Sequence, residues 1–386
     1  MNLAQIAEIL EGSAERYAGA GGVGADRMGL LHNLTAILEK PNVIKLEQRP
    51  IPKPNCTQVL LKMEVVGICG SDIHYWLEGR CGPFVLEAPM VMGHEASGVV
   101  VECGSKVKDL KVGDRVTIEP GYGCRRCTYC KTGKYNICPE MAFCATPPID
   151  GNLCRYFVME ADFCYKLPCN MSLEEGTLME PLAVGVHGCK LAKITLGSVV
   201  FVQGSGPIGL SVLSAARAYG AAAVLVTDIA DYRLEYAKKL GAFETLNTEG
   251  MDENQIAEKV KSILGCEPHA TFECAGNLTC ARLGLLCTRA GGTVVLLGMG
   301  GLEMSLPFGA ALVKEITMIG SFRYNNDYPE AIEMVRTGKV SVKELVTHRF
   351  KIEDTEAAYC TFKNRSGNPI KIMIYCNEDW DGKTPR

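Results

Sequence analysis

Short apolar runs separated by Gly and Pro dominate residues 34–181. Segments such as 58–70 and 96–104 alternate or cluster β-forming residues between turn signals, which is typical of strands. After residue 181 the rhythm changes, and apolar runs at 198–204 and 222–228 enclose a segment with helical spacing. Strands that alternate with helices in this way predict βαβ units and a parallel sheet.

We therefore predict an α/β protein with two domains. A length of 386 residues favours the same division, since single cores stop growing at about 250–300 residues. The β-rich domain comprises residues 34–181, and the doubly wound parallel-sheet domain comprises residues 182–324. Later helical and strand-like patterns are expected to return residues 325–386 to the first domain. Residues 1–33 include a stretch rich in glycine and other small residues, and they are expected to form a flexible N-terminal extension.

Charge and hydropathy narrow the possible partners. The formal net charge is -4 and the isoelectric point is near 6.0, which argues against an electrostatic grip on nucleic acid or anionic lipid. The apolar segment 199–226 contains Gly204, Pro207 and Arg217, so it reads as strand, turn, helix and strand rather than as a membrane span. The N-terminal residues show neither a basic leader nor a long apolar region. We therefore expect a cytoplasmic protein that binds neither nucleic acid nor membrane.

A glycine-rich turn, Gly204-x-Gly206-x-x-Gly209, lies where the first strand of the second domain meets its helix. Glycines there let the backbone approach a pyrophosphate, whose negative charge the helix N-terminus stabilises. Asp228 stands 19 residues after Gly209, at the tip of the next strand. A carboxylate there accepts the ribose 2′-hydroxyl and repels the extra phosphate of NADP, so the pattern predicts an NAD site. Arg233 leaves open a contact with a phosphate or with the adenine, and the alternative is a turn that binds no dinucleotide.

Four of the 19 cysteines are clustered at Cys124, Cys127, Cys130 and Cys138, in a lobe over residues 121–138. Cys-x-x-Cys turns bring thiolates to one centre, and four sulfur ligands complete the tetrahedral shell of Zn²⁺. Since no position remains for water or substrate, we predict a structural zinc that holds a loop. The alternatives are unligated or disulfide-paired thiols, and disulfides are rare in a reducing compartment. A zinc finger that binds nucleic acid is disfavoured, because the cluster lies inside a β-rich domain of an acidic protein.

A second set of possible zinc ligands is dispersed along the chain, at Cys69, His94, Glu95 and Glu180. Cysteine, histidine and carboxylate are the ligand types of a catalytic zinc that keeps one position open. Each residue alone has a simpler explanation, as a buried thiol, a core histidine or an ion-pair partner. Their placement beside glycines, in a chain with a dinucleotide signature, favours the catalytic metal.

Several longer motifs are similar to those of one known family. GHEASGVV, VGICGSDIHYW, the four-cysteine lobe, EPLAVGVH and GSGPIG resemble the zinc-dependent medium-chain dehydrogenases. FCATPPIDGNLCRYF, GSFRYNNDYP and VTHRF narrow the resemblance to the polyol branch of that family, which includes the sorbitol dehydrogenases. The resemblance covers residues 34–376. One departure bears on the substrate, since the animal members of this branch have lost the four lobe cysteines that this chain keeps.

The resemblance implies a GroES-like catalytic domain, a Rossmann coenzyme domain, a zinc ion in the cleft between them, and commonly a homotetramer. It places Cys69, His94 and Glu95 at the zinc. Glu180 is expected to hold the water or substrate on the zinc, and which of Glu95 and Glu180 is the inner ligand stays open.

The resemblance also implies the residues that handle the proton, the substrate and the cofactor. Ser71 and His74 are expected to relay the proton. The polyol is expected to meet Tyr75, Phe143, Glu180, Arg323 and Tyr324. The predicted cofactor contacts are Gly204, Gly206, Pro207, Ile208, Gly209, Asp228, Arg233, Leu297, Gly298, Met299, Ser321, Phe322 and Arg323.

The expected reaction is oxidation of a sugar alcohol to a ketose, with sorbitol to fructose as the first choice and xylitol-type polyols as further substrates. Zinc lowers the pKa of an oxygen that it binds, so the alkoxide formed there can pass hydride to NAD. Two zinc ions per subunit are expected, one catalytic and one structural. The alternatives are an L-arabinitol, L-idonate or L-threonine dehydrogenase, and a non-catalytic dinucleotide-binding protein. The last would be expected to have lost a metal ligand, and none is missing.

Overall fold

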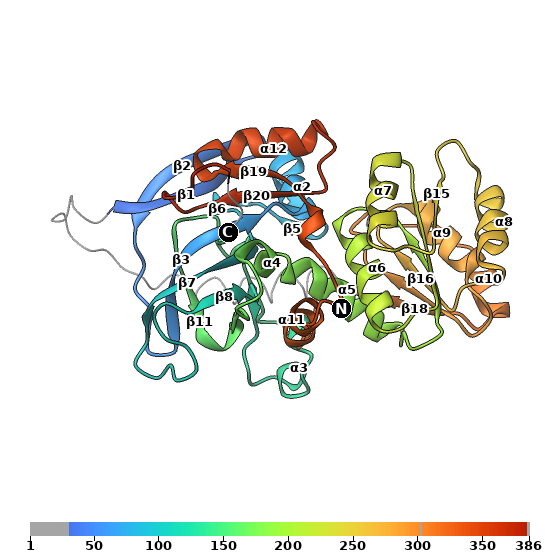
Figure 1. Ribbon diagram of the computed structural model, residues 1–386, viewed down its shortest axis with the longest axis horizontal. Helices are drawn as coiled ribbons and strands as arrows, with labels where there is room; N and C mark the ends of the chain where they lie inside the picture. Colours follow the sequence, from blue (N-terminus) through green and yellow to red (C-terminus); the bar gives the residue numbers. More distant parts are fainter. Residues whose placement is uncertain (1–30, 302, 384–386) are drawn as a thin grey trace.

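The computed structural model describes residues 31–301 and 303–383, which form two bodies side by side (Figure 1). One body consists largely of antiparallel strands and contains both the first and the last described segments of the chain. The other is a parallel sheet with helices on both faces. The predicted α/β fold class is confirmed. Most of the predicted extension, residues 1–33, lies outside the described residues, but residues 31–33 already belong to strand β1 (Leu31–Lys40).

The first body is built on a seven-stranded sheet in the order β12-β8-β7-β3-β20-β19, with β11 also paired to β3. The central strand β3 has an apolar run that is buried on both faces, as expected of a strand inside a sheet. The C-terminal strand β20 pairs antiparallel with β3, so distant segments share this sheet. The strands are β3 (Gln58–Gly67), β7 (Glu95–Cys103), β8 (Arg115–Ile118), β11 (Tyr156–Glu160), β12 (Cys164–Lys166), β19 (Val346–Lys351) and β20 (Lys371–Tyr375).

Smaller sheets and short helices surround this sheet. The small sheets pair β1 with β2 (Val43–Pro50) and β6 (Met90–Val91), β9 (Gly121–Tyr122) with β10 (Ala142–Phe143), and β4 (Arg80–Cys81) with β5 (Phe84–Val85). The helices are α2 (Gly70–Glu78), α3 (Thr128–Lys131), α4 (Leu173–Thr177), α11 (Tyr328–Arg336), α12 (Thr355–Lys363), and the single turns η1 (Tyr135–Ile137), η2 (Ala161–Phe163), η3 (Lys343–Leu345) and η4 (Ile352–Asp354).

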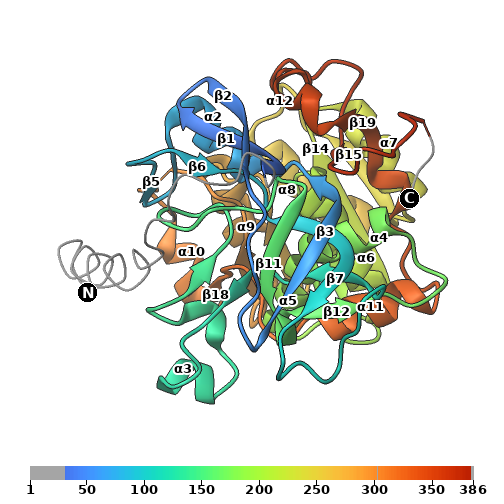
Figure 2. The same cartoon turned by 90° about the vertical axis from the view of Figure 1, so that its left-hand side faces the viewer.

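The β-like pattern of residues 34–181 did not reveal the helices α2 and α4 within it. Helix α4 nevertheless carries a sequence signal, a capping box in which Ser172 and Glu175 satisfy each other's backbone N–H groups. The lobe that contains α3 projects from the first body in both views (Figures 1 and 2).

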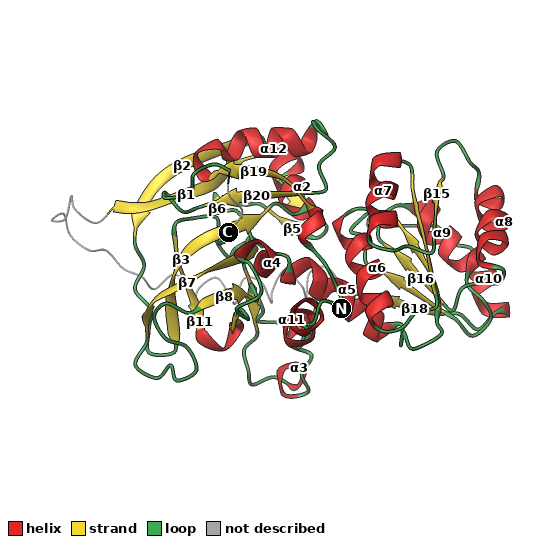
Figure 3. Cartoon of the chain, in the orientation of Figure 1, coloured by secondary structure: helices red, strands yellow, loops and turns green. Residues whose placement is uncertain are grey.

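The second body is a six-stranded parallel sheet in the order β15-β14-β13-β16-β17-β18. Helices α6 and α7 lie on one side of the sheet, and α8 and α10 lie on the other (Figure 3). The strand order reverses between β13 and β16, where ligands bind in open α/β sheets. The elements are β13 (Val199–Gln203), β14 (Ala223–Asp228), β15 (Glu244–Asn247), β16 (Ala270–Glu273), β17 (Thr293–Leu296), β18 (Thr317–Gly320), α6 (Pro207–Ala218), α7 (Asp231–Lys239), α8 (Glu253–Leu264), α9 (Leu278–Cys287) and α10 (Phe308–Val313).

Helix α5 (Met179–Leu191) joins the two bodies, and the predicted boundary between residues 181 and 182 falls inside it. One hydrophobic cluster runs from Val65 of β3 through Leu182 and Val186 of α5 to Val200 of β13. This shared core fixes how the two bodies face each other. None of the described helices is both long enough and apolar enough to cross a bilayer.

Candidate active site

A cleft of about 330 Å³ lies between the two bodies. Residues of both bodies and of α5 line this cleft, so its lining comes from segments that are far apart in the sequence. The predicted site residues that line it are Cys69, Ser71, His74, Tyr75, His94, Glu95, Phe143, Glu180, Gly206, Pro207, Ile208, Leu297, Gly298, Met299, Ser321, Phe322 and Arg323.

A second hollow of about 590 Å³ lies beside the lobe and is lined by residues that include Lys106 and Lys166. Its charged side chains include Arg125, which pairs with Asp162. It contains none of the clustered groups, described below, that could hold a metal ion. We therefore place the chemistry in the cleft.

Three side chains in the cleft converge as a possible metal site. The ligand atoms of Cys69, His94 and Glu95 all lie within 4.8 Å of one another. Cys69 is the N-cap of α2, while Glu95 begins β7 directly after His94. Gly93, at φ 89°, turns the chain into this strand, and a Cβ there would approach Val66 Cγ1 to 2.8 Å. A thiolate, an imidazole and a carboxylate suit a zinc ion with an open position.

Asp72 supports two of these groups, although sequence reasoning did not select it. Its Oδ2 accepts a hydrogen bond from the Cys69 N–H at 3.0 Å, and its Oδ1 lies 3.4 Å from His94 Nδ1. Both Asp72 Oδ1 and His94 Nδ1 are buried without a hydrogen-bond partner among the described residues. Burial acts to lower the pKa of His94, but Asp72 and Cys69 outweigh it and raise that pKa. A carboxylate behind an imidazole orients the ring toward a metal, so the set fits zinc.

Glu95 has a second partner that the sequence did not reveal. The buried ammonium group of Lys371, in β20, donates to both Glu95 oxygens at 2.7 Å and to the Ile68 carbonyl oxygen at 3.1 Å. Burial alone would lower the pKa of Lys371, but Glu95 outweighs burial and raises it, so Lys371 is charged at neutral pH. Lys371 and Glu95 are separated by 276 residues, and no local motif links them.

Glu180 lines the same cleft but is outside the compact group of three ligands. Its Oε1 accepts a hydrogen bond from the buried Tyr324 hydroxyl at 2.8 Å. The pKa of Glu180 is raised to about 7, chiefly by burial and also by Glu95, while His94 and the Tyr324 hydrogen bond act to lower it. The structure thus brings together the two predicted substrate contacts Glu180 and Tyr324.

Arg323 forms the polar wall of the cleft. Its guanidinium carbon lies 3.6 Å from the ring centroid of Phe143, and its Nη2 donates to Thr146 Oγ1 at 3.1 Å. Burial lowers the pKa of Arg323 to about 10, which leaves it charged at neutral pH. Among the described residues it forms no ion pair, so its fork of donors can face a ligand. Tyr75 is also buried here, and burial raises its pKa.

Ser71 and His74 lie at the cleft on the first turns of α2. The side chain of His74 is 45% exposed, and its Nδ1 lies 3.2 Å from Glu78 Oε1. An imidazole between a cleft and solvent is positioned to exchange protons with water.

The glycine turn has the geometry that a dinucleotide needs. Gly204 is at φ 94°, and a Cβ on Gly209 would lie 1.8 Å from the Gly204 carbonyl oxygen. A Cβ on Gly206, by contrast, would meet no described atom within 4 Å. Gly206 is the N-cap of α6, with Pro207 as the first helical residue. The free N–H groups of this helix end therefore face an open cradle suited to a pyrophosphate.

Asp228 ends β14, but neither it nor Arg233 belongs to the lining of the cleft. Its Oδ2 accepts from the Ser205 N–H at 2.7 Å, and its Oδ1 accepts from the Ala230 N–H at 3.0 Å. The Nη1 of Arg233 lies 3.9 Å from Asp228 Oδ2. The Asp228 carboxylate thus stabilises the glycine turn through Ser205, next to the place where it is predicted to bind the ribose.

The four cysteines of the lobe form a second compact group of possible ligands, with all sulfurs within 4.8 Å of one another. Backbone N–H groups approach several of the sulfurs; Cys124 N–H donates to Cys138 Sγ at 3.3 Å, and Cys127 N–H donates to Cys124 Sγ at 3.3 Å. Such donors stabilise thiolates, and backbone N–H groups, first that of Arg126, lower the pKa of Cys124 to about 6. Burial acts in the opposite direction on Cys130 and Cys138, and raises the pKa of Cys138 to about 12. Four sulfurs in this arrangement fit a closed tetrahedral zinc site.

Comparisons with known proteins agree with this geometry. Family models match residues 55–169, as the alcohol dehydrogenase GroES-like domain, and residues 207–337, as a zinc-binding dehydrogenase. Sorbitol dehydrogenase of Gallus gallus is 49% identical over 345 residues, which are 89% of this chain and 97% of that protein. The sorbitol dehydrogenase of Bos taurus is 50% identical over 345 residues, covering 89% and 96% of the two chains.

A solved structure of another dehydrogenase matches the fold of this chain over a similar share of its length, at lower sequence identity. The crystal structure of L-idonate 5-dehydrogenase from Escherichia coli has a TM-score of 0.82 and 29% identity, and the match covers 89% of this chain and 98% of that chain. The level of identity to the sorbitol dehydrogenases is much higher over the same share of the chain. The chain therefore belongs to the zinc-dependent medium-chain dehydrogenases, in their polyol branch.

Proposed function

We propose that this protein is a zinc- and NAD-dependent polyol dehydrogenase that oxidises a secondary hydroxyl of a sugar alcohol to a ketone, with sorbitol to fructose as the first candidate. The observation that carries the proposal is the single cleft in which Cys69, His94 and Glu95 converge beside the glycine turn. The identity to sorbitol dehydrogenases over 89% of the chain supports the substrate class.

Each part of the cleft has a role in this proposal. Cys69, His94 and Glu95 hold the catalytic zinc, and Glu180, the second carboxylate of the site, holds the water or substrate at the metal. A zinc ion held there would supply Lewis-acid chemistry that lowers the pKa of the substrate hydroxyl, and a bound NAD would be the hydride acceptor. The turn at Gly206 cradles the pyrophosphate, and Asp228 selects NAD by meeting the ribose.

The polyol is held by polar groups, because it exposes many hydroxyls and little apolar surface. Arg323 and Tyr75 donate hydrogen bonds to its oxygens, Tyr324 orients Glu180, and Phe143 closes the cleft against water. A buried site that hydrogen-bonds hydroxyls discriminates strongly against analogues that lack them. Ser71 and His74 carry the released proton from the cleft toward solvent.

Substrate rates test the proposal. The rates with sorbitol, xylitol, L-arabinitol, L-idonate and L-threonine are compared, each with NAD and with NADP, and sorbitol and xylitol with NAD are expected to be fastest. Turnover of L-threonine or L-idonate alone would contradict the polyol assignment and favour another enzyme of the family. Absence of turnover with every substrate, in protein that contains zinc and binds NADH, would favour a non-catalytic dinucleotide-binding protein.

Metal analysis tests the two-site scheme separately. Two zinc ions per subunit are expected, and a mild chelator should remove only the ion of the open site, together with activity. The four-sulfur site should keep its ion, because its closed shell offers no position for the chelator to enter. One tightly bound ion in fully active protein would contradict the scheme.

The remaining assignments are also proposals. Residues 34–181 and 325–386 form the catalytic domain, and residues 182–324 the coenzyme domain. Helix α10 exposes three large apolar side chains, Phe308, Leu312 and Val313, and these support self-association of the chain. A homotetramer is the expected state, and a native mass measurement tests it. The unpaired cysteines support a reducing compartment such as the cytoplasm.

A further inference from the structure

The turn that carries Arg323 and Tyr324 into the cleft has an unusual backbone. It follows β18 directly, and both Arg323 and Asn326 are at φ 56°. A left-handed conformation costs a residue with a side chain on the order of 1–2 kcal/mol, least for asparagine. Such a turn persists only where its surroundings hold it, and here it determines where two substrate-facing groups point.

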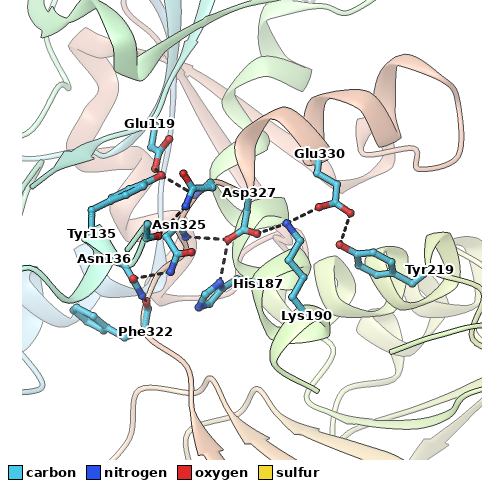
Figure 4. Close-up of polar contacts among 12 residues, drawn as sticks. Glu119, Tyr135, Asn136, His187, Lys190, Tyr219, Phe322, Asn325, Asp327 and Glu330 are labelled. Carbon is cyan, nitrogen blue, oxygen red and sulfur yellow. Dashed lines mark hydrogen bonds and ion pairs between the residues drawn. The ribbon is translucent and has the colours of Figure 1, made fainter. Parts of the chain in front are cut away.

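The four-cysteine lobe provides that support through two adjacent residues of η1 (Figure 4). Asn136 Nδ2 donates to the Phe322 carbonyl oxygen at 2.9 Å, and Asn136 Oδ1 accepts from Asn325 Nδ2 at 2.7 Å. The Tyr135 hydroxyl accepts from the Asn326 N–H at 2.7 Å. We call these contacts of Tyr135 and Asn136 with residues 322–326 the lobe latch. They grip the turn on both sides of Arg323.

The lobe end of the latch is itself held. Asn136 is buried, and the Tyr135 hydroxyl donates to Glu119 Oε1 at 2.6 Å. The hydroxyl of Tyr165 donates to the other Glu119 oxygen at 2.8 Å. In addition, Asn326 Nδ2 donates to the carbonyl oxygen of Gly133 in the lobe at 2.8 Å. Satisfied, buried polar networks of this kind hold one conformation.

The far end of the turn is tied to α5, which carries Glu180 in its first turn. Asp327 is fully buried, and its Oδ2 accepts from the Asn325 N–H at 2.9 Å and lies 3.0 Å from His187 Nδ1. Its Oδ1 accepts from Lys190 Nζ at 2.8 Å. Figure 4 shows Asp327 between the lobe side chains and the α5 side chains. The turn is thus fixed at both ends, and the lobe supplies one of them.

We propose that Tyr135 and Asn136 are positioning residues, through which the four-cysteine lobe sets Arg323 and Tyr324 for the substrate. The lobe then contributes to substrate recognition although none of its cysteines reaches the cleft. The substrate part of this inference rests on the proposed function. The mechanical part, that the latch orders the turn, stands on the contacts alone.

Steady-state kinetics of Asn136→Ala test the substrate part. The KM for the polyol is expected to rise by about tenfold to a hundredfold, because small displacements of positioning groups have effects of this size. The zinc content should be unchanged, and the Kd of NADH should rise less than the KM, because only Phe322 and Arg323 of the predicted cofactor contacts lie in this turn. Thr132→Ala is the matched control, since within the described part of the chain its hydroxyl bonds only to the Thr128 and Tyr129 carbonyl oxygens of the lobe, and its KM should not change.

Tyr135→Phe is the second variant, because it removes only a hydroxyl and tests the latch if Asn136→Ala does not fold. It should raise the KM in the same direction. In the double variant Asn136→Ala/Asn325→Ala, the rise in KM, expressed as a free energy, should be smaller than the sum of the rises in the two single variants. The reason is that both substitutions remove the same hydrogen bond. Folded Asn136→Ala and Tyr135→Phe variants whose KM stays within twofold of the parent would overturn the proposal.

Hydrogen exchange tests the mechanical part without any turnover. The Asn326 amide should be protected in the parent and exchange at least about tenfold faster in both latch variants, but not in Thr132→Ala. Unchanged exchange would overturn the latch even if the enzyme oxidises polyols. Faster exchange in a protein that oxidises no polyol would sustain the latch and refute the proposed function instead.

Discussion

The Lys371 ammonium group lies 2.7 Å from both carboxylate oxygens of Glu95, and each side chain is only 1% exposed. Glu95 is also one of the three clustered metal-ligand candidates, so this buried carboxylate would face two cations when a metal ion is bound. Lys371 therefore balances the negative charge of Glu95 whether or not a metal ion is bound, whereas a buried carboxylate without such a partner would carry a large desolvation cost.

Replacing Lys371 tests that compensation. In Lys371→Met the buried Glu95 loses its counter-charge, and breaking a buried pair in this way costs about 3–5 kcal/mol. The loss in unfolding free energy should be larger in metal-free protein than in zinc-loaded protein, because the metal compensates the same carboxylate. Chemical denaturation of both forms measures it. Lys45→Met, which removes an exposed pair with Glu39, is the control, and an equally small effect for Lys371→Met would contradict the prediction.

Glu119 should give the protein a pH-dependent stability. Burial raises its pKa to about 7 from an ordinary value of 4.5, against the opposing hydrogen bonds of Tyr135 and Tyr165. Between these values the native chain keeps a proton that the unfolded chain releases, so the free energy of unfolding falls as the pH rises from about 4.5 to about 7. The total fall is on the order of 3 kcal/mol.

Glu119→Gln should remove this fall, because the amide does not titrate. Denaturation curves of parent and variant between pH 5 and pH 8 give the difference directly. The exposed Glu344→Gln serves as the control and should follow the parent. Parallel curves for the parent and Glu119→Gln would show that Glu119 carries no such proton.

Two glycines of the same turn should respond differently to alanine. In Gly209→Ala the new Cβ would lie 1.8 Å from the Gly204 carbonyl oxygen, so the backbone must move and the second body should lose at least about 1–3 kcal/mol of stability. In Gly206→Ala the Cβ meets no described atom within 4 Å, so stability should be unchanged. Its methyl group would instead occupy the cradle and raise the Kd of NADH roughly tenfold.

Thermal unfolding and fluorescence titration with NADH separate these two effects. If Gly206→Ala binds NADH as tightly as the parent, the pyrophosphate does not lie over this residue.

The lobe cysteines should hold a metal that supports structure rather than turnover chemistry. Cys138→Ser replaces a buried member of the four-sulfur group and should lower the zinc content by one ion per chain and lower the Tm. The Asn326 amide should also exchange faster, since it is bonded to the lobe through Tyr135. Elemental analysis provides the check, and an unchanged zinc content would exclude the four-sulfur site.

His74 should matter most at low pH. If its imidazole accepts the proton that leaves the cleft, His74→Ala should slow polyol oxidation most where hydroxide is scarce. The pH profile of kcat from pH 6 to pH 10 measures this, with the exposed His32→Ala as the control. A profile identical to that of the parent would contradict a role in proton transfer.

Much of this molecule could be predicted from short-range patterns. Alternating strands and helices predicted the parallel sheet, because hydrophobic periodicity follows from which face of each element is buried. The spacing of Cys124, Cys127 and Cys130 predicted a sulfur cluster, and Gly204 to Gly209 predicted a dinucleotide turn, because these geometries are made within a few residues. The gathering of Cys69 with His94 and Glu95 was expected through family motifs rather than through spacing.

What the sequence by itself determined is therefore the set of local structures and the chemical types at the site. Only the tertiary structure decided that Lys371 would face Glu95 across 276 residues, that Asp72 would stand behind His94, and that Asn136 would hold the turn of Arg323. Lys371 and Glu95 meet because β3 pairs with both β20 and β7, and the other two pairs depend on how α2 and the lobe pack against the rest of the chain. Because such contacts depend on how whole elements pack, they cannot be predicted from a periodicity or motif near either residue of a pair.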